Sequence, residues 1–141
     1  MYTGDASSVQ SGLLTGKAWD RTCRWIEDYI TTINTNSSLK DSRTYGNYFN
    51  SIAPANTGTY SSNQKQLSGA NDNWKTKNIY DLAGNIWEWT NEIYSSDNRI
   101  SRGGGCIDNG DSRPLSCRNN YSYLLTSDRM GFCLGLYIKT N

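Results

Sequence analysis

The segment Asp81-Leu-Ala-Gly-Asn-Ile-Trp-Glu-Trp-Thr90 constrains the fold of this chain more than any other part of its sequence. Its two tryptophans are separated by a single residue, and side chains with that spacing point to the same face of an extended chain. The alternation continues beyond it, with Trp87, Trp89 and Ile93 on one side and mostly polar residues on the other. This pattern predicts a half-buried strand over residues 87–94.

Apolar residues recur three or four positions apart between Lys17 and Ile33, which is the period of an α-helix that buries one face. The charged residues fall largely on the opposite face. Thr15 is suited to cap the first turn, because its hydroxyl can accept a backbone N–H. We therefore expect a helix over residues 17–33 whose buried face carries Trp19, Cys23, Ile26, Ile30 and Ile33.

The rest of the chain combines a long irregular stretch with short strands near the C-terminus. Residues 34–77 are rich in Asn, Ser, Gly and Thr without sustained periodicity, so we expect a surface loop pinned by isolated aromatic residues. Residues 99–102 are predicted to form a short strand that stops at a glycine turn, and alternation over 132–138 predicts a C-terminal strand. One helix, a long loop and late strands describe an α+β fold. Residues 1–14 are expected to be a weakly ordered lead-in to one domain over 15–141.

The composition argues against several classes of function. The sequence has no histidine, which removes the commonest general base and the commonest ligand of zinc or copper. Its four cysteines include no Cys-x-x-Cys pair, so a zinc ribbon is not expected, whereas disulfides and reduced thiols both stay open. The net charge of +1, without a run of like charges, argues against nucleic-acid binding. No apolar stretch predicts membrane insertion or a signal peptide.

Several short motifs follow one another in a consistent order from residue 13 to residue 139. They are Leu14-Thr-Gly-Lys-Ala-Trp-Asp20, Tyr45-Gly-Asn47, Asn78-Ile-Tyr-Asp-Leu-Ala-Gly84, Gly84-Asn-Ile-Trp-Glu-Trp-Thr90, Arg102-Gly-Gly104 and Gly131-Phe132. Each is weak alone, but together they resemble the formylglycine-generating enzyme (sulfatase-modifying factor) superfamily. The resemblance implies a C-type-lectin-like fold with a small mixed or antiparallel sheet, one or two helices and long irregular loops.

That superfamily includes an oxidase that converts a cysteine of a client protein to formylglycine, with copper held by two thiolates. Soft thiolates are the ligands that Cu(I) prefers. In that family the two cysteines lie close together after the Arg-Gly-Gly segment, at positions that fall near Asp108 and Arg113 here. This chain instead has Cys106 and Cys117, eleven residues apart. The oxidase is therefore kept as the alternative function, and the chain is not expected to be an enzyme.

The superfamily also includes the variable proteins of diversity-generating retroelements, found in phage tail tips and on bacterial surfaces. In that group a hypervariable face is encoded between an Arg-Gly-Gly-like segment and a terminal Gly-Phe strand, which corresponds to residues 102–132 here. Tyr, Asn, Ser and Gly, which adaptable binding surfaces use, are frequent in this segment. The resemblance predicts a ligand-binding face that contains Gly105, Cys106, Ile107, Asp108, Asn109, Ser112, Arg113, Cys117, Asn119, Asn120, Tyr121, Tyr123, Leu124, Ser127 and Asp128.

The segment around the tryptophans has alternative interpretations. Glu88 is either a catalytic carboxylate or a structural group, and the sequence places no second acid beside it. Trp87 and Trp89 are either a sugar-stacking platform or core residues, and the core is the more frequent place for such rings. The enzyme branch of the superfamily has a structural calcium site here, whose oxygens would come from Asp81, Gly84, Ile86 and Glu88.

The sequence therefore predicts a non-enzymatic domain that recognises a protein or glycan receptor on a target surface. We expect it to require no cofactor, with structural calcium as an option, and not to bind nucleic acid or insert directly into a membrane. The resemblance suggests a phage tail or a bacterial cell surface as its location. No motif encodes the identity of the ligand or the oligomeric state.

Overall fold

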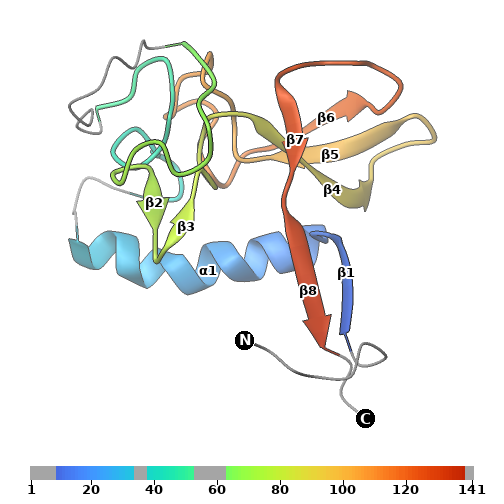
Figure 1. Cartoon of the computed structure of the whole chain (residues 1–141), viewed down its shortest axis with the longest axis horizontal. Helices are drawn as coiled ribbons and strands as arrows, with labels where there is room; N and C mark the ends of the chain where they lie inside the picture. Colours follow the sequence, from blue (N-terminus) through green and yellow to red (C-terminus); the bar gives the residue numbers. More distant parts are fainter. Residues whose placement is uncertain (1–8, 34–37, 53–62, 139–141) are drawn as a thin grey trace.

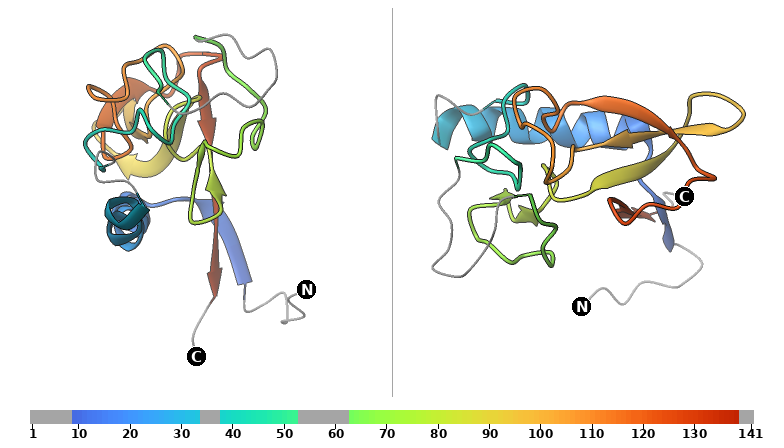
Figure 2. Two further views of the ribbon diagram at one scale, coloured as in Figure 1. Left: turned by 90° about the vertical axis from the view of Figure 1, so that its left-hand side faces the viewer. Right: turned by 90° about the horizontal axis from the view of Figure 1, so that it is seen from above.

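The computed structural model describes residues 9–33, 38–52 and 63–138, which form one helix and several short strands (Figure 1). In chain order the elements are β1 (Val9–Leu13), α1 (Gly16–Ile33), β2 (Lys75–Thr76), β3 (Ile79–Tyr80), β4 (Trp87–Ile93), β5 (Asn98–Arg102), β6 (Arg118–Ser122), β7 (Met130–Phe132) and β8 (Leu134–Ile138). The left view of Figure 2 shows α1 end-on beneath the loops, while β1 and β8 extend further down than the helix. This architecture confirms the predicted α+β class.

The principal sheet has the strand order β6-β5-β4-β7. Strand β4 runs antiparallel to β5 and parallel to β7, so the sheet is mixed. Strand β1 pairs with β8 in a separate antiparallel ribbon, which extends away from the principal sheet beside the start of α1 (Figure 1). Strands β2 and β3 form a third, minimal pair. β4 therefore has a partner on each edge, at least along its first half.

Helix α1 begins where the sequence predicted, because the Oγ1 of Thr15 accepts a hydrogen bond from the Ala18 N–H at 2.9 Å. Its buried face carries Trp19, Cys23, Ile26 and Ile30, as expected, while the side chain of Ile33 lies outside the described part. Burial of a large apolar side chain contributes roughly 1.5–3 kcal/mol, so packing rather than local propensity holds this helix. No helix within the described ranges is long and apolar enough to cross a membrane.

The long loop after α1 is pinned by buried aromatic rings, as predicted. Tyr45, Tyr48 and Trp74 are each at most 6 % exposed, whereas Phe49 lies at the surface. Tyr60 falls outside the described residues. The rings of Tyr45 and Tyr48 pack into the same hydrophobic cluster as the buried face of α1. A chain with few aliphatic residues thus completes its core with aromatic side chains from a loop.

The carbonyl oxygen of Gly103 joins three segments that are distant in sequence. It accepts a hydrogen bond from the Gly84 N–H at 2.8 Å and another from the Oη of Tyr48 at 2.6 Å. Gly84 also forms an isolated parallel bridge with Asn47. Buried backbone groups are costly without partners. Because the Gly103 carbonyl accepts two hydrogen bonds, it holds the long loop and the turn before β4 against the end of β5.

The observed burial along β4 differs from the predicted alternation. Trp87 is buried as expected, but Glu88 and Thr90 are buried as well, and Ile93 is 67 % exposed. The expectation for Ile93 was therefore wrong. β7 pairs only with the first three residues of β4, so the strand runs beyond its neighbour and Ile93 lacks cover. The Oγ1 of Thr90 is accommodated inside by donating to the Ile100 carbonyl at 3.0 Å.

The first and last strands of the described part, β1 and β8, pair with each other, and no local sequence pattern predicts this pairing. Residues 9–13, expected in a weakly ordered lead-in, form β1, and residues 1–8 lie outside the described part. The expected C-terminal strand is divided at Cys133 into β7 and β8. Leu134 and Leu136 of β8 are each 64 % exposed, because their ribbon leaves the principal sheet.

We expect Gly84→Ala to destabilise the domain far more than Gly69→Ala. Both glycines have a positive φ, of 75° and 79°, so alanine at either position is strained by about 1–2 kcal/mol. At Gly84 the new methyl would also overlap the Asn47 backbone, whereas its nearest neighbour at Gly69 would be 3.9 Å away. Chemical denaturation should show a loss of about 3 kcal/mol or more for Gly84→Ala. Equal losses of stability in the two variants would contradict the close approach of Gly84 to the Asn47 backbone.

Candidate ligand-binding cavity

A glycine turn folds the segment after β5 back towards β4. Gly103 and Gly104 have φ values of 88° and 77°, a region that residues with a side chain rarely adopt. A methyl group on Gly103 would lie 2.8 Å from the Leu82 carbonyl oxygen, and one on Gly104 would overlap the Arg113 carbonyl. The turn predicted at these glycines is therefore present, and backbone packs on both sides of it.

Arg102 fastens the loop beyond this turn to helix α1. Its side chain is almost fully buried, pairs with the Asp20 carboxylate and donates to the Ser116 carbonyl at 3.2 Å. The Nε1 of Trp19 donates to the Leu115 carbonyl at 3.2 Å from the same helix. A buried guanidinium is costly unless it is paired, so these contacts leave the loop few alternative positions.

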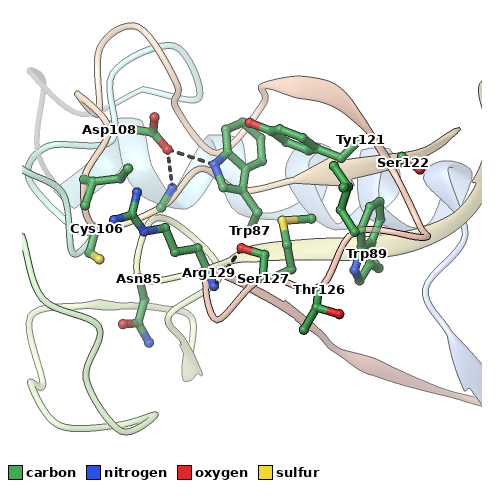
Figure 3. A pocket seen from close by; sticks show the side chains of 14 residues that line it. Asn85, Trp87, Trp89, Cys106, Asp108, Tyr121, Ser122, Thr126, Ser127 and Arg129 are labelled. Carbon is green, nitrogen blue, oxygen red and sulfur yellow. Dashed lines mark hydrogen bonds between the residues drawn. The ribbon is translucent and has the colours of Figure 1, made fainter.

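The folded-back segment and β4 enclose a cavity of about 340 Å³. Its walls combine tryptophan, tyrosine and aliphatic side chains with a few polar groups, as Figure 3 shows. The lining residues are Asn85, Trp87, Trp89, Gly105, Cys106, Ile107, Asp108, Tyr121, Ser122, Leu125, Thr126, Ser127, Arg129 and Met130. A concave, mostly apolar site with a few polar groups is the usual form of a small-ligand pocket.

Hydrogen bonds hold the Asp108 carboxylate against the floor of the cavity. Its Oδ2 accepts a hydrogen bond from the Nε1 of Trp87 at 2.8 Å and another from the Gly105 N–H at 2.9 Å (Figure 3). The rings of Trp87 and Tyr121 meet edge to face, with centroids 6.0 Å apart and an interplanar angle of 67°. Because these contacts cross from the loop and β6 to β4, the aromatic wall is already in place without a ligand.

A polar hollow adjoins the cavity and shares three lining residues with it: Cys106, Ile107 and Arg129. The ammonium group of Lys65 lies 3.1 Å from the Asp128 carboxylate in this hollow. The two spaces together form a surface depression with an apolar half and a charged half.

The structure brings some of the predicted binding residues together and leaves others apart. Gly105, Cys106, Ile107, Asp108, Tyr121 and Ser127 line the cavity. Asp128 lies in the adjoining hollow. Tyr123 contributes to a separate shallow hollow, where the Arg99 guanidinium lies 4.9 Å from its ring centre. The others lie outside the cavity, and they are Asn109, Ser112, Arg113, Cys117, Asn119, Asn120 and Leu124.

Gly105 and Cys106 are buried rather than displayed at the surface. The Cys106 N–H donates to the Asn85 carbonyl at 2.9 Å, so this part of the segment belongs to the scaffold as much as to the cavity wall. Ile107, by contrast, is 43 % exposed and free to contact a ligand. Burial therefore divides the predicted face into fixed and displayed positions.

Several lining residues of the cavity were not predicted from the sequence. Trp87 and Trp89 were assigned mainly to the core, although the alternative of a stacking platform was kept, and Trp89 proves to be only half-buried. Arg129 and Met130 lie directly before the Gly131-Phe132 landmark, and that adjacency was a signal that could have placed them at the site. The remaining omissions are Asn85, Ser122 and Thr126.

The four cysteines are free thiols. Burial raises the pKa of Cys106, and it raises that of Cys23 to about 11 and that of Cys133 to about 12. These groups are therefore protonated at neutral pH and are poor nucleophiles. Cys106 lines the cavity, whereas Cys117 does not.

Two carboxylates are buried near the start of β4, and neither lines the cavity. Asp81 and Glu88 are each 7 % exposed. The Oε1 of Glu88 accepts a hydrogen bond from the Cys133 thiol at 3.1 Å, and the Oδ2 of Asp81 accepts one from the Gly69 N–H at 2.8 Å. Burial raises the pKa of Glu88 to about 7, and the nearby Asp81 acts in the same direction. Glu88 does not line the cavity, which argues against a catalytic role there.

The remaining oxygens of this pair fit the calcium site that the family resemblance implies. Within the described residues, the Oδ1 of Asp81 and the Oε2 of Glu88 are buried without a hydrogen-bond partner. Hard carboxylate and carbonyl oxygens are calcium ligands, and a cation would offset the repulsion between the two acids. No group of three or more acidic, Cys or His side chains in the described part could hold a metal. Calcium would therefore also need the carbonyls of Gly84 and Ile86.

Comparison with known proteins identifies relatives of this fold. The model of the Sulfatase-modifying factor enzyme 1-like domain family matches residues 10–134. The crystal structure of CarF is similar over 92 % of this chain, with a TM-score of 0.59 and 17 % identity. Treponema denticola variable protein 1 is similar over 92 %, with a TM-score of 0.57 and 19 % identity. The chain spans 48 % of the length of each. No curated protein matches the sequence. These similarities confirm the C-type-lectin-like fold.

We expect the free energy of unfolding to fall by about 3 kcal/mol between pH 4.5 and pH 8 in the presence of a chelator, because of Glu88 alone. The pKa of Glu88 is about 7 in the folded protein and 4.5 ordinarily. Its contribution is fully present below the lower value and is lost as pH rises through the higher one. Urea denaturation across this range measures the change. Glu88→Gln should remove most of this change. If the free energy of unfolding of that variant depends on pH as strongly as that of the natural protein, the change does not come from Glu88.

Proposed function

Because this chain belongs to the Sulfatase-modifying factor enzyme 1-like domain family, we propose that it uses the family's C-type-lectin-like scaffold to recognise a ligand and not to catalyse a reaction. One observation carries the proposal. Eleven of the fourteen lining residues of the cavity lie between residues 105 and 130, and the other three come from the segment that carries the two tryptophans. An aromatic floor from β4 is thus combined with a wall from the segment that the family resemblance predicts to be variable.

The composition of the displayed positions supports recognition of a surface. Tyr121, Tyr123, Leu124 and Leu125 are exposed to 37 %, 48 %, 71 % and 66 %. Exposed tyrosines supply large, rigid contact areas at low cost in conformational entropy. Exposed leucines beside them are unusual on a surface without a partner. These residues fit a protein or glycan receptor as the ligand class.

The proposal includes diversification of residues 102–132. Its support is the position of this segment between the Arg102-Gly-Gly104 and Gly131-Phe132 landmarks and the similarity in fold to a structure named variable protein 1. A location on a phage tail or a bacterial surface follows from the same resemblance and is part of the proposal. Since the chain spans about half of each similar structure, the partners of a longer protein are proposals too.

The oxidase alternative receives less support from the geometry. A copper site of that kind needs two thiolates facing one metal. Cys106 lines the cavity but Cys117 does not, and burial raises the pKa of the Cys106 thiol. The two sulfurs that the alternative would need are thus not presented together to the cavity.

We expect the exposed positions of the segment to tolerate randomisation while the fold is kept. A display library randomised at Ile107, Asn109, Ser112, Arg113, Tyr121, Tyr123 and Leu124 should contain a majority of folded clones, because exposed side chains contribute little to stability. Selection against a folded test protein should then yield binders. Thermal unfolding of individual clones measures the first result, and binding assays measure the second.

A control library should randomise buried positions of the same neighbourhood: Tyr48, Trp87, Arg102 and Leu115. Most of its clones should be unfolded. Failure of the exposed library to fold, or to yield any binder after repeated selection, would contradict a display function.

A further inference from the structure

Most polar groups that line the cavity already have partners within the protein. The side-chain oxygen of Asn85 accepts the Gln66 N–H at 2.8 Å, and its amide nitrogen donates to the Gln66 carbonyl at 3.0 Å. Asp108 accepts two N–H groups, from Trp87 and Gly105. The two serines of the wall accept backbone N–H groups. A sugar needs several free donors and acceptors around its ring, so these walls suit an apolar ligand better.

Arg129 is the charged group of this lining whose side chain is left without a partner among the described residues. Within the described ranges its guanidinium has no ion-pair or hydrogen-bond partner, whereas the neighbouring Lys65 is paired with Asp128. It lines both the cavity and the adjoining hollow, and Figure 3 shows its side chain directed towards the Asp108 and Cys106 side of the cavity. The facing acids are engaged elsewhere, Asp108 by two N–H groups and Asp128 by Lys65. Among the residues that the structure describes, the Arg129 guanidinium is thus available at the rim of the cavity.

The apolar part of the cavity has the size and shape for one ring system. Its volume of about 340 Å³ is near the lower end of ligand pockets, which range from about 300 to 1,000 Å³. Trp87, Trp89 and Tyr121 supply aromatic surface, and the edge-to-face contact of Trp87 with Tyr121 is a geometry that a further ring can extend. Leu125 and Met130 close the apolar side.

We propose that this cavity binds an aromatic group that carries a carboxylate close to its ring, with the ring against Trp87 and Trp89 and the carboxylate at Arg129. A guanidinium binds a carboxylate through paired, charge-assisted hydrogen bonds, which are the strongest that such a rim can offer. The inference rests on the proposed function and names the chemistry of its ligand. Such a group occurs in a free aromatic acid and at the C-terminus of a polypeptide that ends in an aromatic residue.

The test compares N-acetyl-L-tryptophan with N-acetyl-L-tryptophanamide, which share the ring and differ in the negative charge. Isothermal titration should show the acid binding at least about tenfold more tightly than the amide, as expected when a charged hydrogen bond is gained. Arg129→Gln should abolish this preference and leave the affinity for the amide within about twofold. Arg21→Gln, the same change on the exposed surface of α1, should leave both affinities unaltered.

A second variant tests the location. Thr126→Trp, which would fill the cavity, should abolish binding of both compounds, whereas persistence of binding in that variant would overturn the proposal. Equal affinities for acid and amide, a preference that survives Arg129→Gln, or binding of neither compound to the natural protein would overturn it as well. If that happens while the display library still yields binders, the ligand chemistry is wrong and the recognition function stands.

A pentapeptide of four glycines and a C-terminal tryptophan distinguishes the two sources. If the pentapeptide binds at least as tightly as N-acetyl-L-tryptophan, and amidation of its C-terminal carboxylate removes this affinity, the ligand is a polypeptide terminus. If the acid binds and the peptide is excluded, the ligand is a free aromatic acid. Both results support the shared chemistry.

Discussion

The carbonyl oxygen of Gly103 is the point on which the other contacts of this domain depend. Its hydrogen bonds from Gly84 and Tyr48 connect the turn before β4, the long loop and the end of β5. Each of these segments lacks regular structure where it meets the others, so this junction substitutes for sheet pairing there. Glycine is required at positions 84 and 103 because the backbone of another segment approaches each of them directly and leaves no room for a side chain.

The cavity is a consequence of this junction. Once the chain turns at Gly103, the next residues return to β4, and the Asp108 carboxylate reaches the Trp87 indole. The floor of the cavity is therefore made by the most constrained part of the fold, while the wall comes from a segment with exposed side chains. Substitutions at the exposed positions of the wall would leave the junction undisturbed, because exposed side chains contribute little to stability.

The sequence predicted the features that depend on local patterns. Helix α1, strand β5 and the glycine turn were found where periodicity and composition placed them, and the ordered motifs predicted the fold class. Features set by distant segments were missed. The exposure of Ile93 depends on the short length of β7, and β1 exists only through pairing with β8. The Arg129 side chain is left available at the cavity rim because Lys65 and Asp128 form an ion pair with each other, and the sequence does not show that pairing.

The central claim is that residues 102–132 form a diversified binding wall on a constant scaffold. Sequencing the gene and its flanking DNA from independent isolates tests this claim most directly. The account predicts a nearby near-repeat of the segment that codes for these residues, next to a reverse transcriptase gene, with differences only at adenines of the repeat. Differences among isolates should spare the codons of Gly103 and Gly104 and those for Trp87 and Trp89. Absence of such a repeat, or differences spread evenly along the gene, would contradict it.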